Sequence, residues 1–221
     1  MSAHYQRCES LPVFIDQLRG PARHWLCALG DSNTCNTQFT AGGKQWPELL
    51  HATLKDLAGT QTLMLANAGV SGDSVVEALA RFDHDVARIR PALTILCLGS
   101  NDAKRLSDVE FDVGLNELLD RLATLGSQVL LRTPTPVWER TPSRIWSADT
   151  ALRAKIERIR AIAAERALPL VDTYALWRDA EQRGELAMQT LMSDEVHTNA
   201  LGHRLVFRQL LPAFGMGMPI A

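Results

Sequence analysis

Residue types that could together transfer an acyl group occur in four short segments spread along the chain. Ser32 offers a hydroxyl nucleophile, and His197 offers a base with an acid three residues before it. Each pattern is common by chance, but the ordered set predicts catalysis. The segments are Gly30-Asp31-Ser32, Gly69-Val70-Ser71-Gly72, Gly99-Ser100-Asn101-Asp102 and Asp194-Glu195-Val196-His197.

The candidate nucleophile directly follows the apolar run Trp25 to Leu29, so Ser32 is expected on a sharp turn at the end of a strand. The alternative is that this segment forms only a turn and a helix cap, since Gly, Asp, Ser, Asn and Thr are common in turns. The spacing from Asp194 to His197 lets the carboxylate hold the imidazole and stabilise the imidazolium. For this pair the alternative is a solvated loop.

A developing oxyanion needs hydrogen-bond donors, and three candidates are present. They are the backbone N–H of Ser32, the backbone N–H of Gly72, whose missing side chain lets a ligand approach, and the carboxamide of Asn101. The alternatives are an ordinary turn glycine and a loop asparagine that bonds its own backbone.

Short aliphatic runs alternate with longer segments of helical period, which predicts one doubly wound α/β domain over residues 1–221 with residues 1–22 packed on it or flanking it. Five mainly parallel strands are expected over Trp25–Leu29, Thr62–Ala66, Leu93–Leu98, Val129–Leu131 and Leu168–Val171. Helices are expected over Trp46–Ala58, Val75–Arg90, Asp108–Leu125, Ala148–Arg166 and Asn199–Leu210. Two long irregular connections are expected over Arg132–Ser147 and Thr173–Ser193. Ligands of such sheets lie beyond the carboxyl ends of the strands.

Composition narrows the classes of partner. The chain has 221 residues, 46% of them hydrophobic, which suffices for a core without metal or disulfide. Its 23 basic and 25 acidic residues are interspersed, so neither nucleic acid nor an anionic membrane is the expected partner. Four cysteines without C-x-x-C spacing predict free thiols, and the absence of a signal-like or membrane-spanning apolar run predicts a cytoplasmic protein without membrane insertion. Both a monomer and a homo-oligomer are compatible with the sequence.

As an ordered set, the four segments resemble the blocks of the SGNH, or GDSL-like, hydrolase superfamily. The match spans residues 30–197, with Ser32, Gly72, Asn101 and His197 at the positions that name the family. The resemblance implies a flavodoxin-like, three-layer α/β/α fold and ester hydrolysis without metal or cofactor. It also implies that His197 takes the proton of Ser32 as the hydroxyl attacks the ester, and that water later hydrolyses the acyl-enzyme.

The chain departs from the family pattern in two segments. Asn33 stands where many members have leucine, and Glu195 and Thr198 replace the usual glycine and proline around the histidine. No reacting group is lost. Glu195 adds a negative charge near His197, which is expected to raise the pKa of that histidine.

Three insertions are candidates for the walls of a substrate pocket: residues 35–44, 103–106 and 132–146. The last contains two tryptophans and three arginines, which suit a sugar ring, an acyl chain or a carboxylate. The alternative is that these tryptophans cover the core and the arginines are solvated. Trp46 is expected in the core. The candidate substrate-binding residues are Asp31, Trp138, Arg144 and Trp146.

These features predict a serine hydrolase of short acyl, acetyl-type esters, since no extended apolar lid for long chains is present. A thioesterase, lysophospholipase or acyltransferase using the same serine is an alternative within enzymes. A flavodoxin-like module that binds phosphate or FMN through residues 32–37 is an alternative from another class. A carbohydrate-binding or scaffolding protein without turnover is a further alternative.

Overall fold

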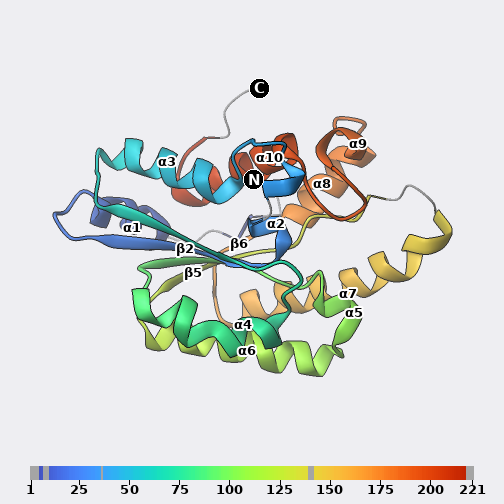
Figure 1. Ribbon diagram of the computed structural model, residues 1–221, viewed down its shortest axis with the longest axis horizontal. Helices are drawn as coiled ribbons and strands as arrows, with labels where there is room; N and C mark the ends of the chain where they lie inside the picture. Colours follow the sequence, from blue (N-terminus) through green and yellow to red (C-terminus); the bar gives the residue numbers. More distant parts are fainter. Residues whose placement is uncertain (1–4, 7–9, 36, 139–141, 218–221) are drawn as a thin grey trace.

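The computed structural model describes residues 5–6, 10–35, 37–138 and 142–217. Side chains are described for residues 11, 14–35, 38–138 and 149–217. Helices form one layer on each side of a central sheet (Figure 1). The α/β/α class predicted from the sequence is therefore confirmed.

The sheet contains five parallel strands and a short antiparallel edge strand in the order β1-β6-β5-β4-β2-β3. The parallel strands therefore run β3-β2-β4-β5-β6, the flavodoxin-like order. The chain changes direction across the sheet at β2, which opens a crevice between the carboxyl ends of β2 and β4. The strands are β1 (Tyr5–Gln6), β2 (His24–Gly30), β3 (Leu63–Gly69), β4 (Leu93–Cys97), β5 (Gln128–Arg132) and β6 (Leu170–Val171).

The antiparallel edge strand β1 was not predicted. It pairs with β6 over two residues, with Tyr5 opposite Val171 and Gln6 opposite Leu170. Two residues are too few to show an alternating pattern in the sequence. The other strand boundaries agree with the predictions or differ from them by at most three residues.

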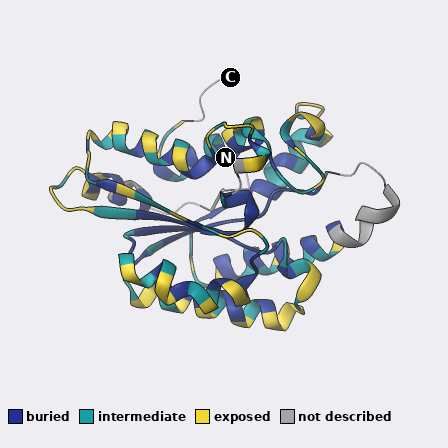
Figure 2. Ribbon diagram, in the orientation of Figure 1, coloured by how far each residue is buried: buried dark blue, intermediate teal, exposed yellow. Residues whose placement is uncertain are grey.

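Alternate residues of each strand face opposite helical layers, as the twofold period of a strand requires. Leu26 and Ala28 of β2 pack in one apolar cluster, whereas Cys27 and Leu29 pack in the other. The first cluster lies under α1 (Ser10–Leu18), α3 (Trp46–Ala58), α8 (Thr173–Gln182) and α10 (Ala200–Leu210). The second lies under α4 (Val75–Asp85), α6 (Asp108–Thr124) and α7 (Pro142–Glu165). Buried residues accordingly line the sheet and the inner helix faces (Figure 2).

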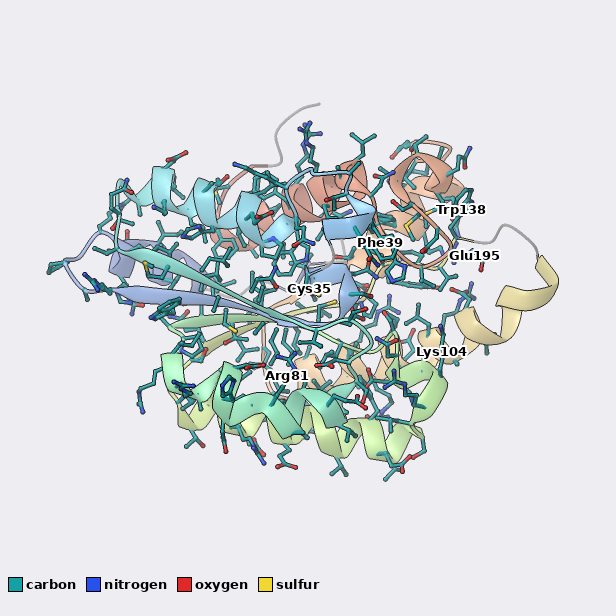
Figure 3. All side chains as sticks on the ribbon, in the orientation of Figure 1. Cys35, Phe39, Arg81, Lys104, Trp138 and Glu195 are labelled. Atoms are coloured by element: carbon teal, nitrogen blue, oxygen red, sulfur yellow. The ribbon has the colours of Figure 1, made fainter. Side chains whose placement is uncertain are left out.

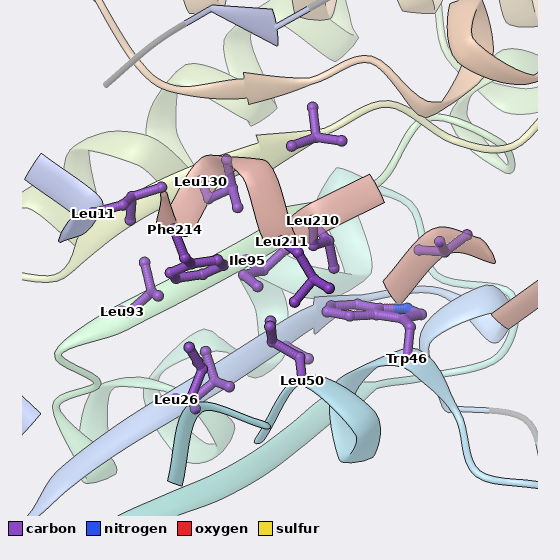
Figure 4. Packing of buried hydrophobic residues seen from close by; sticks show 14 of the residues in the cluster. Leu11, Leu26, Trp46, Leu50, Leu93, Ile95, Leu130, Leu210, Leu211 and Phe214 are labelled. Carbon is purple, nitrogen blue, oxygen red and sulfur yellow. The ribbon is translucent and has the colours of Figure 1, made fainter. Parts of the chain in front are cut away.

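The first cluster shows how the strands and helices meet. Trp46 is fully buried there, as predicted for a core residue. Figure 4 shows side chains from the strands opposite side chains of α3, α10 and the segment that follows α10. The strand residues are Leu26, Leu93, Ile95 and Leu130, and the others include Trp46, Leu50, Leu210, Leu211 and Phe214.

Capping residues close to the helix ends determine where several helices begin or end. Two capping boxes form, with Ser74 and Glu77 opening α4, and Ser107 and Glu110 opening α6. Gly59 closes α3 with a left-handed backbone, φ 62°. The two residues of each capping box are only three positions apart, so these helix starts can be recognised in the sequence.

Three predicted segments are corrected by the structure. Helix α4 ends at Asp85 and a 3-10 turn, Ala87–Ile89, follows it, so the predicted single helix to Arg90 is wrong at its end. Helix α7 begins at Pro142, six residues before its predicted start. The stretch 173–193, predicted to be irregular, holds α8 and the short α9 (Met188–Leu191).

The missed helix α8 has a local signal that could have revealed it. Asp172 caps it by accepting a hydrogen bond from the N–H of Ala175, and Tyr174 and Trp177, three residues apart, are buried. In the described part of the chain, no helix is long and apolar enough to cross a bilayer.

Candidate active site

The turn that carries Ser32 is positioned by close packing of three strand ends. Gly30, the last residue of β2, pairs with Gly69 of β3 and with Cys97 of β4. A Cβ atom on Gly30 would lie 2.7 Å from the carbonyl oxygen of Cys97, so only glycine fits there. Ser32 then opens the short helix α2 (Ser32–Cys35) beyond the sheet edge.

The histidine lies in a tight loop between α9 and α10. Met192 and Thr198 form an antiparallel bridge, and the N–H of Ser193 donates to the carbonyl of His197 at 2.8 Å. Within the loop, Oδ1 of Asp194 accepts hydrogen bonds from the backbone N–H groups of Val196 at 2.8 Å and His197 at 2.7 Å. The same carboxylate that faces the imidazole therefore also shapes the loop.

Ser32, His197 and Asp194 form a continuous chain of contacts. Nε2 of His197 lies 3.1 Å from Oγ of Ser32, and Nδ1 lies 2.7 Å from Oδ2 of Asp194. Burial raises the pKa of Asp194, but hydrogen bonds from two backbone N–H groups and from His197 outweigh it and hold the pKa below its usual value. An ionised Asp194 favours a proton on Nδ1, which leaves Nε2 free to accept the serine proton.

The second and third segments approach the same turn from the neighbouring strands. Gly72 has a left-handed backbone, φ 85°, and its carbonyl accepts a hydrogen bond from Nη2 of Arg105 at 2.6 Å. Nδ2 of Asn101 donates to the carbonyl of Asp73 at 3.0 Å. The Gly72 carbonyl and the Asn101 carboxamide are thus each held by a hydrogen bond.

Two buried acid groups tie these segments together. Asp102 accepts hydrogen bonds from the N–H of Val75 at 2.8 Å and the N–H of Gly99 at 2.9 Å, which joins the loops after β3 and β4. Asp73 accepts from Nε of Arg81 at 2.6 Å, and the same guanidinium donates to the carbonyl of Ala68. Figure 3 shows Arg81 reaching from α4 toward the sheet.

A cavity of about 270 Å³ opens at this end of the sheet. It is lined by four of the five residues predicted for catalysis and for the oxyanion site, and the fifth, Asp194, contacts His197. Its lining is apolar on Val137, Leu152 and Val196 and polar elsewhere. The polar lining residues are Asp31, Ser32, Asn33, Ser71, Ser100, Asn101, Lys104, Thr135 and His197, with Gly72 contributing backbone.

Asp31, predicted to contact substrate, lines this cavity but is only 2% exposed. Its Oδ1 accepts a hydrogen bond from the N–H of Asn33 at 2.9 Å, so it shapes the turn after Ser32. Burial raises the pKa of Asp31 to about 6, although this hydrogen bond and the charge of Arg132 lower it.

The other candidate substrate-binding residues lie apart from the cavity lining or outside the described residues. Trp138 is half-buried against the first apolar cluster, and its backbone N–H donates to the carbonyl of Glu195 at 2.8 Å. The side chains of Arg144 and Trp146 are not among the described residues, and neither is Arg140. Arg132 is only 1% exposed, with its guanidinium over the Trp46 ring, so it is neither a solvated nor a cavity-lining arginine.

Sequence reasoning missed two contacts of the histidine loop. The ring of Phe39 stacks on the imidazole of His197, with centroids 3.8 Å apart and planes inclined by 8°. Phe39 lies in the first predicted insertion, but nothing in its spacing indicated the stack. Figure 3 shows Phe39, Glu195 and Lys104 at the end of the molecule where the strands terminate.

The second missed contact joins two of the three departures from the family pattern, Asn33 and Thr198. Oδ1 of Asn33 accepts a hydrogen bond from the N–H of Thr198 at 3.0 Å, a donor that proline lacks. Their separation of 165 residues hid this contact in the sequence. Glu195, the third departure, is exposed, and its expected effect on His197 stays a prediction.

Comparison with known proteins agrees with this geometry. The model of the GDSL-like Lipase/Acylhydrolase family matches residues 28–205. An acetylxylan esterase of Geobacillus stearothermophilus is 29% identical over 175 residues, which cover 76% of this chain and 77% of that protein.

Solved structures share the fold. A catalytic mutant of Axe2, an acetylxylan esterase from Geobacillus stearothermophilus, superposes with a TM-score of 0.72 at 22% identity, covering 92% of this chain and 99% of that one. LAE5, an alpha/beta hydrolase enzyme from the metagenome of Lake Arreo, Spain, superposes with a TM-score of 0.72 at 24% identity, covering 90% and 98%. The fold, the ordered segments and the family match lead to one conclusion: the chain belongs to the GDSL-like lipase/acylhydrolase family and is a carboxylic ester hydrolase.

Proposed function

We propose that this protein hydrolyses acetyl and other short-chain acyl esters through an acyl-enzyme on Ser32, with His197 as the base and Asp194 orienting it. The observation that carries the proposal is the unbroken contact chain from Oγ of Ser32 through the imidazole to Oδ2 of Asp194, at 3.1 and 2.7 Å. Ser32 and His197 line a cavity, in which an ester can reach the hydroxyl.

Acylation begins when Oγ of Ser32 attacks the ester carbonyl carbon. Nε2 of His197 takes the hydroxyl proton, and Asp194 stabilises the imidazolium that forms. The tetrahedral intermediate then collapses, the bond to the leaving alcohol breaks, and the imidazolium donates its proton to that alcohol. Water attacks the acyl-enzyme in the second half-reaction, His197 takes its proton, and the carboxylic acid leaves with Ser32 restored.

Three donors are proposed for the oxyanion: the N–H of Ser32, the N–H of Gly72 and Nδ2 of Asn101. The support is that all three residues line the cavity, that Arg105 anchors the carbonyl of Gly72, and that the carbonyl of Asp73 holds the carboxamide of Asn101. Donors fixed in advance need no reorganisation when charge develops. Loss of one such donor costs about 2.7 to 4 kcal/mol of transition-state stabilisation.

The preference for a short acyl group is supported by the cavity and by the relative of known activity. Val137, Leu152 and Val196 offer a small apolar wall, while Ser71 and Lys104 offer donors to a polar alcohol. The relative with 29% identity is an acetylxylan esterase. We therefore propose acetylated sugars, including acetylated xylo-oligosaccharides, as the substrates to test first. The comparisons favour none of the thioesterase, lysophospholipase, acyltransferase or flavin-binding alternatives.

The test measures hydrolysis of p-nitrophenyl acetate, butyrate and octanoate and release of acetate from acetylated xylo-oligosaccharides, all in buffer with EDTA. Ser32→Ala and His197→Ala are compared with the wild type, and His84→Ala, on an exposed helix position, is the matched control. We expect turnover by the wild type and the control, loss to background in both site variants, and the highest rate on acetyl esters.

The outcomes separate the parts of the proposal. Equal rates for the wild type and a folded Ser32→Ala variant would refute the nucleophile. A rate that increases from acetate to octanoate would refute the short-chain preference alone. Because no step of the scheme uses a metal, a large loss of activity in EDTA would contradict the mechanism.

A further inference from the structure

Four residues from four separate segments form a closed ring of hydrogen bonds behind the Ser32 and His197 pair. The hydroxyl of Thr198 donates to Oδ1 of Asn33 at 3.1 Å, and its oxygen lies 3.1 Å from Nε2 of His203. The N–H of Trp46 donates to Nδ1 of His203 at 3.4 Å. The indole Nε1–H of Trp46 closes the ring by donating to the carbonyl of Asn33 at 3.2 Å.

The direction of every hydrogen bond in this ring is determined. The Thr198 hydroxyl has one proton, which Asn33 receives, so the Thr198 oxygen accepts from Nε2–H of His203. Nδ1 of His203 must then be unprotonated, which is the form that accepts from the N–H of Trp46. A single neutral tautomer of His203 satisfies all these partners.

Three of the four ring residues are closed off from water. Thr198 is 2% exposed, His203 is 1% exposed and Trp46 is fully buried. Burial and the nearby charge of Arg132 lower the pKa of His203 to about 4, in agreement with the neutral form that the geometry requires. A buried polar group that loses its partner there stays unpaired.

Asn33 directly follows the candidate nucleophile, and its side chain forms hydrogen bonds with the residues before and after the candidate base. Its Nδ2 donates to the carbonyl of Val196, one residue before His197, at 3.0 Å. Its Oδ1 accepts from the backbone N–H and the hydroxyl of Thr198, one residue after His197. The loop that carries the imidazole is thus bonded on both flanks to the residue that follows Ser32.

We propose that Asn33, Thr198 and His203 are positioning residues, and that their ring sets the distance between Oγ of Ser32 and Nε2 of His197. The ring acts on the candidate base through its two neighbours, and His203 and Trp46 anchor Thr198 and Asn33 to the starts of α10 and α3. A displacement of about 1 Å between reacting groups can cost about 100-fold in rate. The inference rests on the proposed function of Ser32 and His197.

The test removes one atom group at a time. Thr198→Val keeps the shape and the backbone N–H but deletes the hydroxyl, and Thr198→Ser restores it. Asn33→Ala deletes all three side-chain hydrogen bonds to the residues on either side of His197. Thr124→Val and Asn116→Ala on α6 are the matched controls, remote from the site. The measurements are kcat and KM for p-nitrophenyl acetate per active site, with active sites counted by a serine-directed phosphonate, and the rate at which that phosphonate labels Ser32.

We expect kcat to fall about tenfold in Thr198→Val and about 100-fold in Asn33→Ala, with KM nearly unchanged and labelling slowed in parallel. Thr198→Ser should recover most of the rate. The double variant should lose less than the product of the two single losses, because in Asn33→Ala the Thr198 hydroxyl has already lost one of its two ring partners. A merely structural role would lower the number of active sites or the Tm without changing kcat per site.

A folded Thr198→Val protein with wild-type kcat per site would overturn the inference, as would a rise in KM alone. If Asn33→Ala does not fold, the comparison of Thr198→Val with Thr198→Ser decides by itself. Turnover or labelling that persists in Ser32→Ala would instead show that the proposed function has failed. Wild-type behaviour of Thr198→Val beside an inactive Ser32→Ala overturns only the role of the ring.

Discussion

Replacing Asp194 with asparagine separates the two tasks of this carboxylate. Oδ1 accepts two backbone N–H groups and shapes the loop, whereas Oδ2 faces Nδ1 of His197 at 2.7 Å. In Asp194→Asn the amide oxygen can still accept the two backbone donors. The amide nitrogen then faces Nδ1, so it donates where the carboxylate accepted.

The donor at that position favours the wrong tautomer, with the proton of the imidazole on Nε2. Such a histidine presents N–H to Oγ of Ser32 and cannot take its proton. The same change in a serine protease triad, where the geometry stays intact, lowers kcat by about 10⁴-fold. We expect a loss of that order here, equivalent to about 5.4 kcal/mol in the activation barrier.

The assay is steady-state hydrolysis of p-nitrophenyl acetate by Asp194→Asn and Asp194→Ala, with thermal unfolding of both. Asp194→Asn should lose activity but little Tm, because the loop retains its two hydrogen bonds. Asp194→Ala should lose activity and also Tm. A folded Asp194→Asn variant with kcat within tenfold of the wild type would show that Asp194 does not orient His197, and would refute the reasoning.

Three further outcomes are expected. Phe39→Leu removes the ring stacked on His197. It should lower kcat for p-nitrophenyl acetate about three- to tenfold, with little change in the far-ultraviolet circular dichroism spectrum. An unchanged kcat would contradict a role for the stack. Burial raises the pKa of Asp31 from 3.8 to about 6, so the folded state binds more protons than the unfolded chain in that window and stability falls as pH rises through it. Asp31→Asn should remove about 2 to 3 kcal/mol of that loss, measured as the difference between urea unfolding at pH 4 and pH 7, whereas an identical pH dependence in both proteins would rule it out. Gly30→Ala places a Cβ atom 2.7 Å from the carbonyl of Cys97 and should lower stability by about 1 to 3 kcal/mol and displace Ser32, seen as lower Tm and lower kcat together.

Local features were predictable because their causes lie within a few residues. Ser74 with Glu77, and Ser107 with Glu110, bond one another across a single turn, so both helix starts follow from the sequence. The same holds for the loop in which Asp194 bonds the N–H of His197 three residues later. The missed helix α8 carried its own cap at Asp172, so that error lay in the interpretation and not in the signal.

The order of the strands was less accessible. Nothing local distinguishes β6, which lies at the far end of the parallel strands, from β3, which lies beside β2 at the other end. The burial of Arg132 was also hidden, since an arginine in a loop-like stretch is ordinarily exposed. Packing between distant segments decided both.

The sequence by itself determined which chemical groups are available. They are a serine after a predicted strand, an acid three residues before a histidine, and a glycine and an asparagine that each follow another predicted strand. Only the tertiary structure decided that Oγ of Ser32 meets Nε2 of His197 across 165 residues, that Phe39 covers the imidazole, and that Asn33 bonds Thr198. The physical reason is range. Capping and turn chemistry act through a few bonds of the chain, whereas distances between loops are set by the packing of the sheet and helices that carry them.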